Sequence, residues 1–121
     1  MLSEQEITRG HLARVRWRQL PVDTRRQVLR QARRGRPIAD PNVAAVAVGW
    51  AWQVLGEPGP SRPKKRLQGL WFLAEVFMAA TGGARPTNAT ALIDGDEEHD
   101  ANLYVRWLAR QIERANPVYR T

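Results

Sequence analysis

The sequence has no cysteine and only two histidines, so side chains that bind metals or act as nucleophiles are scarce. Without cysteine, disulfide bonds and thiolate metal sites are excluded. No H-E-x-x-H motif supports a zinc site, and no Ser-His-Asp arrangement can be assembled. No glycine-rich loop carries the Lys and Ser or Thr that bind phosphate in nucleotide-binding proteins. We therefore expect a protein that is not an enzyme and that carries no cofactor or metal.

Long apolar runs are also missing. The most apolar segments lie within residues 41–55 and 64–80, and both fall short of the roughly 20 residues that a membrane-spanning helix needs. The first residues, MLSEQE, are polar and acidic, unlike the basic and then apolar start of a secretory signal. These features predict a cytoplasmic protein without a transmembrane span. Peripheral contact between its basic half and an anionic membrane stays an open alternative.

Negative charge is scarce in the first half of the chain. Residues 1–66 contain 14 Lys and Arg against 5 Asp and Glu, whereas residues 67–121 contain 5 against 7. Such asymmetry indicates an anionic partner for the first half. Codon bias is a competing explanation, because 17 of the 19 basic residues are Arg. Arg, Ala, Gly and Pro all have GC-rich codons, and a high-GC bacterial genome produces an Arg excess without selection for a ligand.

Apolar residues recur mostly at helical spacing, and no segment alternates as a strand does. No internal repeat is visible, and a chain of 121 residues is the size of one ordinary domain. The pattern predicts an all-α fold, a single-domain irregular or orthogonal bundle of about five helices. The predicted helices cover residues 4–19, 21–34, 41–55, 64–80 and 96–115.

Capping residues set the predicted helix boundaries. Ser3 and Glu6 form a capping box at the start of the first helix. Asp40 precedes Pro41, a pair typical of a helix start, and the uncharged helix that follows is predicted to be buried at the centre. The acidic run 94–100 places several carboxylates in the expected first turn of the last helix, where the helix dipole favours them.

One face of the predicted helix 21–34 is a stripe of arginine. Its four members lie within about 100° of one another, opposite an apolar side; they are Arg26, Arg30, Arg33 and Arg34. Further basic residues of the first half are weaker candidates for the same role: Arg14, Arg16, Arg18, Lys64, Lys65 and Arg66. The leading hypothesis is therefore a non-catalytic protein that binds a polyanion, and we expect nucleic acid. Contact through phosphates predicts weak sequence preference and strong salt dependence.

Tryptophan side chains stack on bases when they are exposed. Trp17 is the candidate, since it lies between arginines in Arg14–Arg18. The favoured alternative packs Trp17 against a neighbouring helix, and Trp50 and Trp107 are expected in the core. A helix-turn-helix made from residues 21–55 is rejected, because its second helix lacks polar side chains for base edges.

Two other patterns suggest metal or acid–base chemistry. The run 94–100 has hard oxygen ligands for Ca²⁺ or Mg²⁺, but the EF-hand pattern fails because its sixth and twelfth positions are His99 and Val105. His99-Asp100 resembles the HD dipeptide of metal-dependent phosphohydrolases, yet no later Asp completes that site. His11 is expected on the inner face of the first helix, as a core residue rather than a base.

A rival hypothesis from a different class starts from the apolar excess of residues 41–55 and 64–80. This surface is wide for one small core, and it suggests a protein–protein adaptor or a small homo-oligomer without a nucleic-acid role. A strictly monomeric chain with no large exposed apolar patch counts against that hypothesis.

Overall fold

The computed structural model describes residues 2–56, 93–95 and 97–119, and this part of the chain is mostly helical. Its α-helices are α1 (His11–Gln19), α2 (Val22–Arg33), α3 (Pro41–Leu55) and α6 (Leu103–Ala115). Two short 3₁₀ helices are also present, η1 (Glu4–Glu6) and η3 (Glu97–His99). The predicted all-α class is confirmed. The predicted count of five helices is not, because the helix expected at 64–80 lies outside the described residues.

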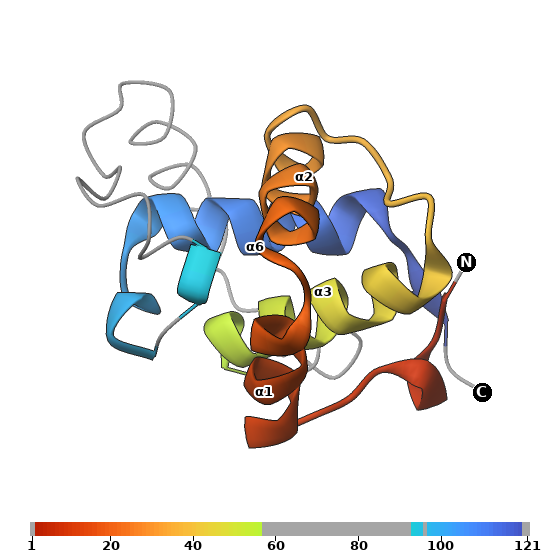
Figure 1. Ribbon diagram of the computed structural model, residues 1–121, viewed down its shortest axis with the longest axis horizontal. Coiled ribbons are helices and arrows are strands. Elements are labelled where there is room, and N and C mark those ends of the chain that lie inside the picture. Colours follow the sequence, from red (N-terminus) through yellow and green to blue (C-terminus); the bar gives the residue numbers. More distant parts are fainter. Residues whose placement is uncertain (1, 57–92, 96, 120–121) are drawn as a thin grey trace, which may run out of the picture.

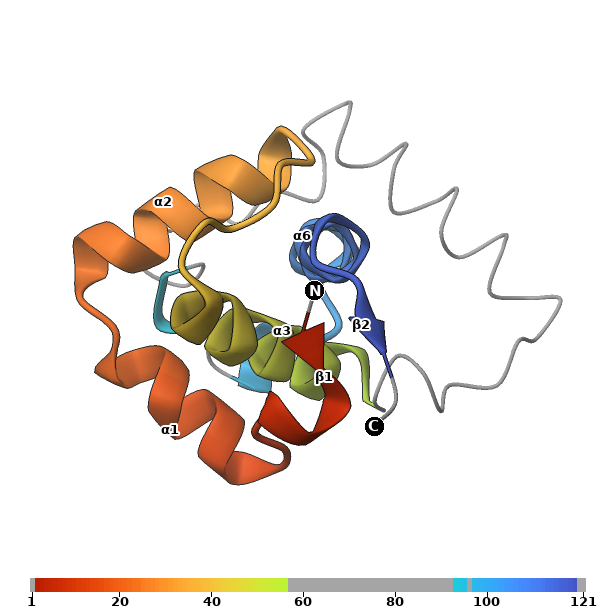
Figure 2. The same cartoon turned by 90° about the vertical axis from the view of Figure 1, so that its right-hand side faces the viewer.

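Helix α3 is the centre of the described structure. It packs against α1 and α6, and α2 packs against α6. Figures 1 and 2 show α3 and α6 side by side, with α1 and α2 on one side of that pair. The prediction that residues 41–55 form the buried central helix is confirmed. Its buried residues are Ala44, Ala47, Val48, Gly49, Trp50, Ala51, Trp52, Val54 and Leu55.

Local capping chemistry explains why α2 and α3 have the predicted bounds to within one residue. The Asp40 carboxylate accepts hydrogen bonds from the backbone N–H groups of Asn42 (2.9 Å) and Val43 (3.4 Å). These are two of the N–H groups that a helix start leaves without an intrahelical partner. At the other ends, Gly35 and Gly56 take positive φ angles of 64° and 90°, which glycine adopts without steric cost.

The first helix begins later than predicted. The capping box forms as expected, since the Ser3 N–H donates to the Glu6 carboxylate (3.0 Å). It caps only the 3₁₀ turn η1, because Gly10 (φ 69°, ψ −155°) interrupts helical geometry before α1. The later start changes which side chains face inward, and His11 is exposed instead of lying on the inner face. The buried residues of α1 are Ala13, Arg14 and Trp17.

A short parallel strand pair joins the two ends of the described chain. Strand β1 (Leu2–Ser3) pairs with β2 (Val118–Tyr119). The Leu2 N–H also donates to the carbonyl of Pro117 (3.2 Å). The sequence predicts no strand here, because two residues are too few to show the alternation that identifies one.

The last helix also starts later than predicted, at Leu103 rather than near residue 96. Asn102 is the actual N-cap, and its side chain accepts hydrogen bonds from the N–H groups of Tyr104 (2.9 Å) and Val105 (3.2 Å). The acidic residues that were expected to fill the first turn therefore precede the helix. Because they precede the helix, their carboxylates can contact other elements of the fold.

Candidate polyanion-binding surface

Segment 93–95 binds to arginines from α1 and α2. Three successive backbone carbonyls of this segment each accept a hydrogen bond from a different arginine. The bonds run from Arg25 Nη1 to Ile93 O (3.1 Å), from Arg18 Nε to Asp94 O (3.4 Å) and from Arg14 Nη1 to Gly95 O (2.7 Å). Guanidinium groups suit this task, because they offer several donors in a rigid plane. We call these three side chains the inner arginines.

Two stacked tryptophans also form hydrogen bonds with segment 93–95. The rings of Trp17 and Trp50 lie 4.7 Å apart at 13°. Their indole N–H groups donate to Ile93 O (2.9 Å) and Gly95 O (3.4 Å) respectively. Trp17 is fully buried, at 0% exposure. Its predicted packing against a neighbouring helix is therefore confirmed, and it is not available to stack on a base.

Carboxylates within and after this segment pair with two of the inner arginines, Arg14 and Arg25. Asp100 forms an ion pair with Arg14, and Glu97 Oε1 lies 3.8 Å from Arg14 Nε. Asp94 Oδ1 lies 3.7 Å from Arg25 Nη1. Arg14 is only 2% exposed and is held by these partners, so its predicted place in a surface site is wrong. Within the described ranges, no three His, Asp or Glu side chains lie close enough together to hold a metal ion.

Burial raises the pKa of the Asp100 carboxyl above its ordinary value of 3.8. The loss of solvent is the largest effect, and it outweighs the attraction and hydrogen bond of Arg14, which lower the pKa. The nearby Glu97 raises the pKa further, whereas Arg106 lowers it. The folded state therefore favours the protonated form of Asp100 more than the unfolded chain does.

This shift predicts a pH-dependent difference between the protein and its Asp100→Asn variant. As the pH falls toward 3.8, the folded chain takes up the Asp100 proton before the unfolded chain does. Lowering the pH through the raised pKa should therefore increase the unfolding free energy of the unsubstituted chain relative to D100N. Below the unfolded pKa the difference should level off. Urea titrations of both proteins at successively lower pH measure it, and a difference that falls with decreasing pH would contradict the raised pKa.

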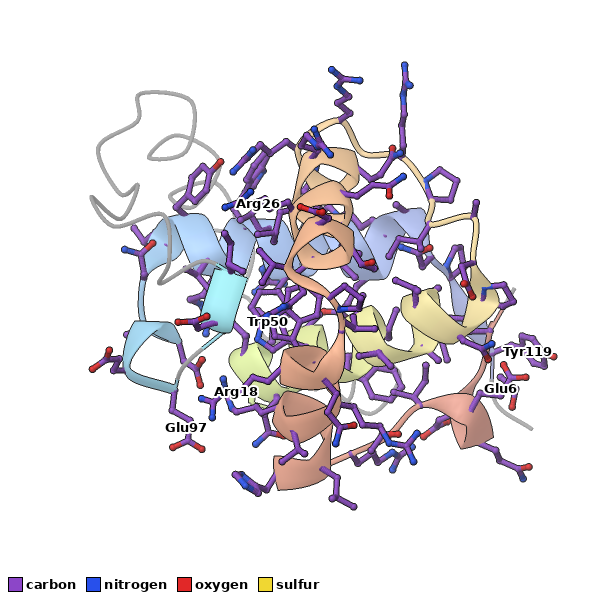
Figure 3. All side chains as sticks on the ribbon, viewed as in Figure 1. Glu6, Arg18, Arg26, Trp50, Glu97 and Tyr119 are labelled. Atoms are coloured by element: carbon purple, nitrogen blue, oxygen red, sulfur yellow. The ribbon has the colours of Figure 1, made fainter. Side chains whose placement is uncertain are left out.

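The predicted arginine stripe lies outside this network. All four of its members (Arg26, Arg30, Arg33 and Arg34) are exposed, opposite the buried apolar side of α2. In the part of the chain that the structure describes, none of them forms an ion pair with a carboxylate. Arg33 Nε donates to the hydroxyl of Tyr104 on α6 (2.9 Å). In Figure 3, Arg26 lies where α2 crosses α6, well above Arg18 and Glu97.

The remaining predicted site residues do not join the stripe. Arg16 is exposed but lines a separate hollow of about 340 Å³ with residues of the N-terminal segment and α3, such as Glu6 and Asn42. Arg18 is exposed and bonded to the Asp94 carbonyl. Lys64, Lys65 and Arg66 lie outside the described residues.

Two arginines near the stripe have positions that the sequence did not predict. Arg36 is exposed just beyond the end of α2. Helical spacing says nothing about its position, because it lies outside the helix. Arg25 is buried (8% exposed) beside the apolar residues of α2, although its charge marks it as a surface residue. In the sequence, only the position of Arg25 next to the apolar side of the helical wheel indicated that it is buried.

Comparisons of the chain with family models, curated proteins and solved structures gave no match. No helix in the described ranges is long and apolar enough to cross a membrane.

Proposed function

We propose that this chain is a non-catalytic binding protein that contacts a polyanion, namely nucleic acid, through the arginine stripe. The observation that carries the proposal is the sorting of the arginines. Each inner arginine donates to a backbone carbonyl of segment 93–95, and Arg14 and Arg25 also pair with carboxylates. The stripe instead presents four exposed guanidinium groups without a carboxylate among the described residues. Such groups bind phosphate through paired N–H donors.

The dimensions of the stripe suit a phosphate backbone. Helix α2 has 12 residues, and a helix of that length is roughly 18 Å long. Phosphates along one nucleic-acid strand repeat about every 3.4 Å on the helix axis. Several phosphates of one strand can therefore lie along the stripe at once.

Simpler explanations account for only part of the pattern. The helix dipole favours basic residues in the last turn of α2, which contains Arg30 and Arg33. It does not favour Arg26, which lies about two turns before Arg33. Codon bias accounts for the number of arginines in the chain. It does not account for a division in which some arginines neutralise the chain's own acids and others are left exposed.

The rival adaptor hypothesis gains no support from α3. Most apolar side chains of this helix are buried within the described structure, where α3 packs against α1 and α6. The other half of the surface on which that hypothesis depends, residues 64–80, lies outside the described residues. We therefore put forward one function.

Removing charge from the stripe should weaken binding and reduce its salt dependence. We expect Arg30→Gln with Arg34→Gln to lower affinity for a labelled oligonucleotide on the order of tenfold at low salt, because binding then releases fewer counterions. The slope of log affinity against log salt should become shallower by about 0.7–0.9 for each phosphate that the variant no longer neutralises. Fluorescence anisotropy at several salt concentrations measures both quantities.

A matched control removes the same charge elsewhere. Arg9 and Arg16 are exposed, and Arg9 is paired with Glu4. Changing both to Gln lowers the net charge equally, and we expect a much smaller loss of affinity and an almost unchanged slope. An equal loss for the two pairs, or no salt-sensitive binding even at low salt, would overturn the proposal.

A further inference from the structure

One side of α6 carries an aromatic ring next to basic residues. Trp107, Arg110 and Arg114 lie within about 60° of one another around the helix axis. Arg114 is exposed, and both Trp107 and Arg110 are partly exposed. Basic residues next to a flat aromatic ring are typical of surfaces that bind unpaired nucleotides.

Tyr104 links this face of α6 to the arginine stripe. Its hydroxyl accepts the hydrogen bond from Arg33 Nε (2.9 Å). Its ring lies 5.7 Å from the ring of Trp107, tilted by 41°. The contacts therefore run without a break from the guanidinium of Arg33 on α2 to the indole of Trp107 on α6. Arg33 is exposed and Trp107 is partly exposed. Because both contact the buried Tyr104 (5% exposed), they lie close together at the edge of the core.

Trp107 differs from the tryptophans of the core. Trp17 and Trp50 are 0% and 1% exposed, and both indole N–H groups donate to backbone carbonyls. The ring of Trp107 keeps part of its surface exposed at the edge of the core. In the part of the chain that the structure describes, its N–H has no acceptor. A ring in this position can stack on a base.

We propose that the ligand is single-stranded nucleic acid, with a base stacked on Trp107 and the adjoining phosphates held by the stripe. The inference rests on the proposed function and names its substrate class. In a duplex the bases are paired and stacked on one another, so their faces are not available to Trp107. An unpaired base offers its face, and stacking on aromatic side chains is the usual way to hold it. The base-stacking role that the sequence suggested for Trp17 belongs to Trp107.

The test compares a labelled oligothymidylate of about 12 nucleotides with a duplex of equal length. Both are titrated with the unsubstituted chain and with Trp107→Leu, which keeps an apolar side chain of helical propensity but removes the flat ring. We expect tighter binding of the single strand. W107L should lose about tenfold in affinity for it and almost nothing for the duplex. Trp107→Phe, which restores a ring, should recover much of the loss.

The outcomes separate this inference from the proposed function. Equal affinity for the two ligands, or an equal loss for both in W107L, overturns the single-strand inference and leaves binding through the stripe intact. Absence of salt-sensitive binding to either ligand overturns the proposed function. If thermal unfolding shows that W107L is misfolded, the preference of the unsubstituted chain and the behaviour of W107F decide the question.

Discussion

Replacing Gly95 by Ala is expected to lower the free energy of unfolding by about 2–5 kcal/mol. Gly95 has a φ of +65°, a left-handed conformation that costs an L-residue about 1–2 kcal/mol. An added Cβ would also lie 2.5 Å from Trp50 Nε1 and 2.9 Å from the Trp17 ring. Both rings are fully packed in the stack, and an overfilled core site of this kind typically costs about 1–3 kcal/mol more.

Gly35 supplies a matched control for this prediction. Its φ of +64° is almost the same, but an added Cβ would meet only Gln111 Nε2, at 3.7 Å. Gly35→Ala should therefore show only the backbone cost, about 1–2 kcal/mol. Urea denaturation of the two variants measures the difference, which isolates the close approach of segment 93–95 to the tryptophans. If both variants lose the same stability, the segment is not seated on the stack as described.

The helices that sequence reasoning located best are those with strong local signals at both ends. The Asp40 cap and the glycines after α2 and α3 act through hydrogen bonds to residues two to four positions away, and a sequence displays such neighbours directly. The start of α6 was misplaced because two local signals competed. The acidic run satisfies the helix dipole, but Asn102 supplies the actual cap.

The candidate surface was only partly predictable for a related reason. Amphipathic spacing located the stripe, because exposure follows from the apolar side of the same helix. Spacing could not show that Arg14 turns inward, since its partners Gly95 and Asp100 lie 81 and 86 positions along the chain. Nor could it assign the tryptophans. Trp17 lies among arginines in sequence yet is buried in the fold, whereas Trp107 lies on an apolar face yet keeps part of its ring exposed.

Arg14→Met is expected to lower the free energy of unfolding by about 3 kcal/mol. The substitution leaves the Gly95 carbonyl without its 2.7 Å bond and removes the ion-pair partner of Asp100. Breaking a buried pair by removing one partner typically costs about 3–5 kcal/mol. The lower end applies here, because the Asp100 side chain is 28% exposed and solvent screens the charge that the substitution leaves unpaired. Methionine fills much of the same volume, which limits the cost of a cavity.

The neighbouring Arg16 provides the control, because it belongs to the same helix but is exposed. Arg16→Met should change stability by no more than about 0.5 kcal/mol, as is usual for surface substitutions. The double variant Arg14→Met with Asp100→Asn tests the mechanism. It should be less destabilised than the sum of the two single variants, because the second change removes the carboxylate that the first leaves unpaired. Strict additivity would mean that Arg14 stabilises the fold only through the carbonyl of Gly95.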